Sequence, residues 1–158
     1  MSPTLQDEIR QTRPFDSLQQ EVLLNLARTS AVLMHRMEQH FREFSLTATQ
    51  YNVLRIVQGA GPSGISQCDI AARLVTETPD VPRLLKRTET AGLIERTVAP
   101  DDKRVLRVCL TPAGSRLLKQ MAPRIAELTK SLFPSLTCHQ LETLNELLNA
   151  SREKSLHR

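Results

Sequence analysis

The segment from Phe15 to Phe44 contains neither glycine nor proline, and its apolar residues recur at helical spacing. This stripe consists of Phe15, Leu18, Val22, Leu26, Leu33, Met37, Phe41 and Phe44. A helix of that length extends beyond a small domain, so part of its apolar stripe stays uncovered unless another helix packs against it. The sequence therefore predicts one long helix within residues 1–44, and it predicts a partner helix for it.

Two shorter helices are predicted to follow. The first begins at Thr47, because Gln50 three residues further on completes a capping-box pattern, and it ends near Gly61. The second lies within residues 64–75, with Ser66 as its N-cap. Its inward-facing residues are expected to be Ile70, Ala71 and Leu74.

The start of the fourth predicted helix leaves two alternatives open. Thr78 is a suitable N-cap, and Pro79 would then occupy the first helical position. Pro82, however, lacks a backbone donor early in such a helix, and an N-cap at Asp80 would relieve this problem. Gly92 is expected to take the left-handed conformation just after the end of this helix.

Two short strands are predicted at residues 93–99 and 104–110, with the charged residues 100–103 at the turn between them. In chain order, the elements are two helices, two short helices, a hairpin and two further helices. This order predicts a mainly α fold with a winged helix-turn-helix domain at residues 45–110. Such a domain inserts the N-terminal part of its second short helix into the major groove of DNA.

Residues 111–158 are predicted to form the last two helices. Thr111 is expected to cap the first of them, with Pro112 in its first position. Pro123 lies within that helix and is expected to kink or split it. The predicted apolar positions are Leu117, Met121, Ile125, Leu128 and Leu132 in the first helix, and Leu141, Leu144 and Leu148 in the last.

The basic residues of the fourth helix are candidates for DNA contact. Val81, Leu84 and Leu85 form its apolar face, so Arg83 and Lys86 project away from that face. An arginine there can contact a guanine edge with two hydrogen bonds or pair with a phosphate. The alternative is that these basic residues form a solvated helix face and bind nothing. Net charge does not decide between DNA contact and a solvated face, because residues 62–114 contain eight basic and seven acidic residues.

The hairpin and the helix before it resemble the MarR (multiple antibiotic resistance regulator) family of winged-helix transcription regulators. The family motif is D-x-R at the wing tip, then a strand, then L-T-x-x-G. This chain has Asp102-Lys103-Arg104, then "VLRVC", then "LTPAG" at residues 110–114. Upstream, "RLLKRTETAGLIER" is similar to the family's pattern for the recognition helix and first wing strand.

The resemblance implies a homodimer that binds double-stranded DNA at a pseudo-palindromic operator, with the terminal helices (1–44 and 111–158) forming the dimerisation region. It implies that Arg104 reaches into the minor groove, that Asp102 orients it, and that Arg83 belongs to the recognition helix. This chain departs from the family pattern at two positions. Thr88 stands where the family usually has leucine, and Pro82 stands where relatives often have a polar residue. Thr88 is expected to loosen the core beneath the helix. The predicted DNA-binding residues are Ser66, Gln67, Thr78, Arg83, Lys86, Arg87, Asp102, Lys103 and Arg104.

By the same resemblance, the protein is a ligand-responsive repressor whose effector is a small phenolic or anionic molecule. The predicted effector pocket is lined by Met34, Met37, Tyr51 and Leu54, residues that core packing would also explain. No cofactor and no metal are predicted, since His35 and Glu38 lie one helical turn apart but lack a third ligand. Cys68 and Cys109 are interpreted as small packing residues, and Cys138 as the more reactive thiol.

Composition excludes several other classes of protein. No apolar run is long enough for a membrane span, the N-terminus lacks a signal-peptide pattern, and three widely spaced cysteines fit reduced thiols, so a cytoplasmic protein is expected. The sequence contains neither a glycine-rich phosphate-binding loop nor a nucleophile motif, so an enzyme is not predicted. The net charge of +4 is compatible with a polyanionic partner. The alternative function is a winged-helix module that binds proteins and not DNA.

Overall fold

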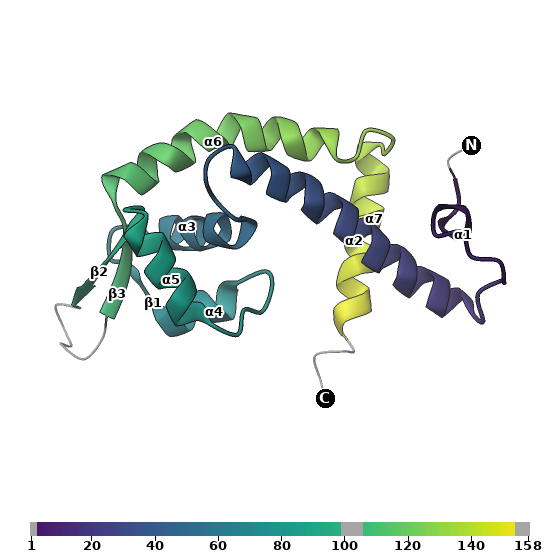
Figure 1. The fold of residues 1–158 in the computed structure, drawn as a ribbon, viewed down its shortest axis with the longest axis horizontal. Helices are drawn as coiled ribbons and strands as arrows, with labels where there is room; N and C mark the ends of the chain where they lie inside the picture. Colours follow the sequence, from purple (N-terminus) through teal and green to yellow (C-terminus); the bar gives the residue numbers. More distant parts are fainter. Residues whose placement is uncertain (1–2, 99–105, 154–158) are drawn as a thin grey trace. The chain divides into compact units, whose positions relative to one another are not determined.

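The computed structural model describes residues 3–98 and 106–153. The chain divides into a unit from Met1 to Met121 and a unit from Ala122 to Arg158. The first unit contains the short helix α1 (Leu5–Glu8), the long helix α2 (Leu18–Arg42), and the helices α3 (Ala48–Ala60), α4 (Gln67–Arg73) and α5 (Val81–Thr90) (Figure 1). It also holds the strands β1 (Ile65–Ser66), β2 (Ile94–Val98) and β3 (Leu106–Leu110), followed by the start of α6 (Pro112–Ser131).

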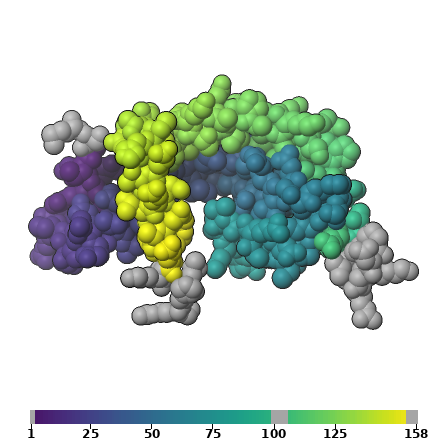
Figure 2. Space-filling view, turned by 180° about the vertical axis from the view of Figure 1, so that it is seen from behind, coloured from purple at the N-terminus to yellow at the C-terminus, as the bar shows by residue number. Residues whose placement is uncertain are grey.

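The three strands form one antiparallel sheet in the order β1-β3-β2. β2 pairs with β3 from Ile94 opposite Leu110 to Val98 opposite Leu106, which confirms the predicted hairpin. β1 was not predicted, because a two-residue strand exists only through its pairing with β3, where Ile65 lies opposite Val108. The sheet lies beside α3, α4 and α5, and these helices form one compact block in the space-filling view (Figures 1 and 2).

Side-chain caps set the helix boundaries of this block. Thr47 and Gln50 form the predicted reciprocal capping box, and the Ser66 hydroxyl accepts a hydrogen bond from the Asp69 N–H at 3.1 Å. Another cap, in α1, was not predicted: the Thr4 hydroxyl and N–H donate to the Asp7 carboxylate and hold the pKa of Asp7 below its ordinary value.

The fourth helix begins later than a cap at Thr78 would require. Asp80 is the N-cap of α5, and its Oδ1 accepts a hydrogen bond from the Arg83 N–H at 2.9 Å. Pro82 therefore lies in the first turn, where backbone N–H groups have no partner within the helix, so the missing donor costs little. The Thr78 hydroxyl instead donates to the carbonyl of Thr76. The prediction of an N-cap at Thr78 was wrong, and the alternative prediction of an N-cap at Asp80 is confirmed.

The core of the first unit lies between the sheet and its helices. Its fully buried side chains include Val53, Leu54, Ile70, Leu85 and Ile94. Ile70 faces inward as predicted, but Ala71, the next residue of α4, is exposed. Leu74 is only half-buried, because α4 ends at Arg73 and the chain turns extended there. Gly92 has φ +72°, which confirms the left-handed conformation predicted after α5.

Thr88 is fully buried, and its hydroxyl donates to the Leu84 carbonyl at 2.9 Å. The hydroxyl is therefore satisfied within its own helix.

Thr88→Val keeps the volume of the side chain and removes its hydroxyl. The Leu84 carbonyl still accepts its backbone N–H within the helix. We expect the free energy of unfolding in urea to change by less than about 1 kcal/mol. A loss of more than about 2 kcal/mol would show that the hydroxyl is essential to the packing of α5.

The second unit contains the rest of α6 and α7 (Cys138–Glu153). α6 continues through Pro123 without interruption, so of the two predicted effects of this proline, a kink or a split, the split was wrong. The kink stays a prediction. Thr137 and Gln140 exchange capping hydrogen bonds at the start of α7, and Leu141, Leu144 and Leu148 are half-buried along it. In the described part of the chain, no helix combines the length and the apolar character that a membrane span requires.

Candidate nucleic-acid interface

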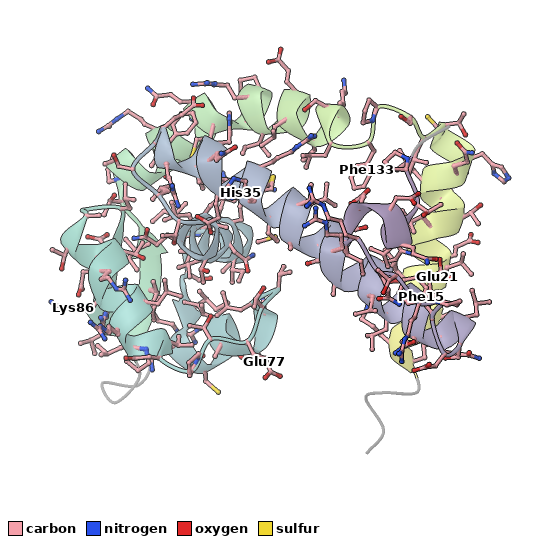
Figure 3. The ribbon with its side chains drawn as sticks, turned by 45° about the vertical axis from the view of Figure 1, so that its right-hand side comes forward. Phe15, Glu21, His35, Glu77, Lys86 and Phe133 are labelled. Carbon is pink, nitrogen blue, oxygen red and sulfur yellow. The ribbon has the colours of Figure 1, made fainter. Side chains whose placement is uncertain are left out.

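Helix α5 has two chemically different faces. Val81, Leu84, Leu85 and Thr88 are buried, whereas Arg83, Lys86 and Arg87 are exposed. Figure 3 shows Lys86 at the outer edge of the helix. The sequence thus predicted the orientation of this basic face, because the buried residues recur at helical spacing.

Arg83 and Arg87 lie one turn apart on α5, so their guanidinium groups belong to one stretch of surface. In the described ranges, no carboxylate forms an ion pair with either of them. Both line a polar pocket of about 410 Å³, together with Asp80 and Glu38. Two unpaired guanidinium groups on an exposed helix face can bind phosphate or the acceptor edge of guanine.

Glu89 connects this helix to the first strand of the hairpin. Its Oε2 lies 3.4 Å from Lys86 Nζ and 3.4 Å from Arg96 Nη2, which places one carboxylate between α5 and β2. Arg96 Nε is buried and has no hydrogen-bond partner among the described residues. The Lys86–Glu89 pair could have been predicted from its i,i+3 spacing. The pair with Arg96 could not, because it depends on how the strand packs against the helix.

The other predicted DNA-binding residues fall into two groups. Ser66 and Gln67 lie at the start of α4, where Ser66 serves as the N-cap and Gln67 is exposed. Thr78 lies in the connection between α4 and α5 and is half-buried. Asp102, Lys103 and Arg104 lie outside the described residues, in the segment that joins Val98 of β2 to Leu106 of β3.

A pocket of about 210 Å³ lies between α2, α3 and the connection from α4 to α5. Three of the four residues predicted to line an effector pocket line it, and the fourth, Leu54, is fully buried in the core. The Phe41 and Tyr51 rings stack at 4.8 Å within its wall. The complete lining is Met34, Met37, Phe41, Ala48, Thr49, Tyr51, Asn52, Val75 and Thr76.

The remaining candidate residues have local roles. His35 Nε2 lies 3.0 Å from the Gln39 amide nitrogen, and Glu38 accepts a hydrogen bond from the Ala48 N–H at 3.2 Å. The interpretation of Cys68 as a packing residue was wrong, because this thiol is exposed on α4, while Cys109 is half-buried and Cys138 is exposed. Among the described residues, no cluster of three or more metal-ligating side chains occurs.

A helix-turn-helix with an exposed basic helix and an adjoining hairpin is the arrangement found in known regulators. A family model described as "MarR family" matches residues 44–105. The multiple antibiotic resistance protein MarR of Salmonella typhimurium is 35% identical over 104 residues, which cover 65% of this chain and 71% of that protein. The chain belongs to the MarR family. It is therefore a winged-helix transcription regulator, and the family it belongs to is one of regulators and not of enzymes.

Two further comparisons connect this MarR-family chain to characterised proteins. The HTH-type transcriptional repressor IacR of Pseudomonas putida is 28% identical over 123 residues, covering 78% of this chain and 72% of that protein. The crystal structure of the S. aureus MepR–DNA complex is similar with a TM-score of 0.73 and 25% identity, covering 82% of this chain and 94% of the MepR chain.

The MarR-family motif at residues 110–114 has a structural explanation in this chain. The Thr111 hydroxyl donates to the Gly92 carbonyl at 2.7 Å and accepts from the Gly114 N–H at 3.0 Å, which confirms Thr111 as the cap of α6. The Thr111 N–H donates to the Leu93 carbonyl at 3.1 Å. The motif thus holds the end of α5, the start of β2 and the first turn of α6 together, and it fixes where the hairpin leaves the helical block.

Proposed function

We propose that this MarR-family protein is a ligand-responsive repressor that binds a pseudo-palindromic operator in double-stranded DNA as a homodimer. The observation that carries the proposal is the exposed basic face of α5, with Arg83 and Arg87 unpaired within the described residues and the buried face docked on the core. The relative IacR is a repressor and MepR is known bound to DNA, and both support it. Ser66, Gln67, Thr78, Lys86 and the wing residues 102–104 complete the proposed DNA surface.

Selection of bound sequences from a random duplex pool tests this function directly. An enriched palindrome is expected, because a two-fold dimer presents two copies of α5 to two half-sites one helical turn apart. Enrichment of no sequence would favour the alternative, a winged-helix module that binds proteins. The basic surface of α5 would have no role in such a module.

The exposed apolar side chains of α2 support the homodimer. Phe41 is the one fully buried side chain of this helix, which the structure describes along its whole length, whereas Leu18 is 71% exposed and Leu23 is 65% exposed. A stripe of exposed apolar side chains along one helix of a monomer is a surface for protein contact. The proposed dimerisation region comprises residues 1–44 and 111–158, with residues 45–110 as the DNA-binding domain.

We expect sedimentation equilibrium at micromolar concentration to show a dimer. Leu23→Glu places a charge on the exposed apolar stripe and should weaken the dimer at least tenfold. Gln39→Glu is the matched control, because it adds the same charge at an exposed polar position on the opposite side of the same helix and should leave the dimer intact. A folded monomer of the unmodified chain would contradict the homodimer.

The wing is expected to contribute through Arg104. Arg104→Ala should weaken operator binding and reduce the slope of log affinity against log salt by about one, because each lost phosphate-like contact releases about one fewer counterion. Fluorescence anisotropy over a salt series measures both quantities. Unchanged affinity and slope would remove the wing from the mechanism.

The effector is proposed to be a small phenolic or anionic molecule, bound in the pocket beside Tyr51. Met34, Met37 and Tyr51 line this pocket, which lies against the connection that leads into α5. A ligand there can affect DNA binding only if it binds the two conformations of the DNA-binding domain with different affinities.

A further inference from the structure

The two ion pairs of Glu89 differ in how far they are shielded from water. Its Oε2 lies 3.4 Å from Lys86 Nζ and 3.4 Å from Arg96 Nη2. The Lys86 side chain is 71% exposed, whereas the Arg96 side chain is only 24% exposed. Solvent screens an exposed ion pair, which then contributes little, whereas a largely buried guanidinium requires a partner for its charge. Glu89 therefore binds chiefly to Arg96, and this bond joins α5 to β2.

Stability alone does not explain the pair between Glu89 and Arg96. Within the described ranges, Glu89 is the one carboxylate that forms an ion pair with Arg96, whose Nε is buried without a hydrogen-bond partner. A largely buried ion pair loses hydration on both sides, and apolar side chains of similar volume often stabilise a fold as well or better. What such a pair adds is a directional contact between the two groups, which fixes the elements that carry them.

Arg96 lies at the level where the hairpin leaves the core. Val108, which is opposite Arg96 on β3, is fully buried. The next pair on the same face of the hairpin is Val98 opposite Leu106, and these side chains are 52% and 50% exposed. At this level, burial of Val108 holds β3 against the helices, and the ion pair with Glu89 holds β2.

The base of the hairpin is attached separately. The Thr111 N–H donates to the Leu93 carbonyl at 3.1 Å, and the Thr111 hydroxyl donates to the Gly92 carbonyl at 2.7 Å. These bonds act at the end of the hairpin where β2 begins and β3 ends. Figure 1 shows both strands beside α5. Because the bonds of Thr111 and the pair between Glu89 and Arg96 lie at different points along β2, together they fix its direction relative to α5.

We infer that Glu89 is a positioning residue for operator recognition, which acts through Arg96 to hold the hairpin at the angle to α5 that lets both elements contact one operator. This inference rests on the proposed function and names the residue that couples its two DNA-contacting elements. Arg83 lies on α5, and the proposed wing residues 102–104 follow β2 in the chain. The grooves of a duplex have fixed widths, so a change in this angle weakens operator binding more than binding to random DNA, which needs only phosphate contacts.

The first test measures selectivity, defined as the Kd for random duplex divided by the Kd for the selected operator, by fluorescence anisotropy. Glu89→Gln should lower this ratio by about fivefold or more. Glu95→Gln is the matched control, because it removes the same charge next to Arg96 but on the opposite face of β2, and it should keep the ratio within about twofold. Arg96→Lys keeps the charge that pairs with Glu89, so it should also keep the ratio within about twofold. An equal loss of selectivity in Glu95→Gln would show a general effect of charge and would overturn the inference.

A double variant separates positioning from stability. Glu89→Gln alone leaves Arg96 without its partner and should lower the urea midpoint of unfolding by about 0.5 M or more. Glu89→Gln combined with Arg96→Met removes both charges and keeps an apolar stem on β2, so its midpoint should lie within about 0.3 M of that of the unmodified chain. Its selectivity should nevertheless stay about fivefold low or lower, because the ion pair is absent. A double variant with full selectivity would show that the pair only stabilises the fold, and would overturn the inference.

Residual dipolar couplings of the backbone N–H groups measure the orientation of the hairpin without DNA. In the unmodified chain, the couplings of β2 and β3 should fit the same alignment tensor as those of α3 and α5. In the double variant, the hairpin couplings should fall by about a third or more, because β2 moves relative to α5. Unchanged couplings would overturn the inference. Failure to select any operator would overturn the proposed function instead, and the couplings would still decide whether the pair between Glu89 and Arg96 orients the hairpin.

Discussion

Gly114→Ala is expected to lower the free energy of unfolding by about 3 kcal/mol or more. A Cβ at this position would lie 2.1 Å from the Leu93 carbonyl oxygen and 3.2 Å from the Leu110 side chain. The oxygen belongs to the backbone at the start of the hairpin, and it already accepts the Thr111 N–H at 3.1 Å. Relief of the clash therefore requires either the hairpin or the first turn of α6 to move.

The matched control is Gly59→Ala in α3, where an added Cβ meets no atom within 4 Å. Alanine has a higher helix propensity than glycine, so this change should stabilise the protein by about 0.5 to 1 kcal/mol. Urea unfolding followed by circular dichroism measures both variants. A Gly114→Ala protein as stable as the parent would show that α6 does not approach β2 as closely as the structure indicates.

Features that depend on hydrogen bonds between neighbours in the chain could be predicted from the sequence. The Thr47 capping box, the Ser66 cap and the Thr111 cap each need residues only three positions apart, and all three form. The start of α5 was ambiguous because Thr78 and Asp80 are both good caps. Asp80 takes the role because Pro82 then falls among the first-turn positions that need no N–H donor.

Features that depend on distant parts of the chain could not be predicted in this way. Asn52 and Val75 are far apart in sequence, and nothing in their local pattern indicates that they share a hydrogen bond. The Glu89–Arg96 pair depends equally on how α5 meets β2. Leu54 was predicted to line the effector pocket and lies in the core, because helical periodicity shows that a residue faces inward but not what it faces.

Arg83→Ala is expected to lower operator affinity by about 1 to 3 kcal/mol per half-site, or roughly 5-fold to 150-fold. Arg83 is exposed on the first turns of α5, its backbone N–H is held by Asp80 at 2.9 Å, and its guanidinium has no ion pair within the described residues. The helix start is therefore fixed while the side chain is free to reach a base or a phosphate. Lys119→Ala, which removes one exposed charge from α6, should change affinity by less than twofold.

Arg83→Lys separates the two contacts that this arginine can make. Lysine keeps the charge but cannot form the paired hydrogen bonds that arginine makes with guanine. If Arg83 reads a base, Arg83→Lys should lose most of the preference for operator over random duplex while it keeps the salt dependence of binding. If Arg83 binds only phosphate, lysine should restore nearly full affinity for both duplexes. Anisotropy titrations with the two duplexes distinguish these outcomes, and unchanged affinity in Arg83→Ala would show that α5 is not the helix that reads the operator.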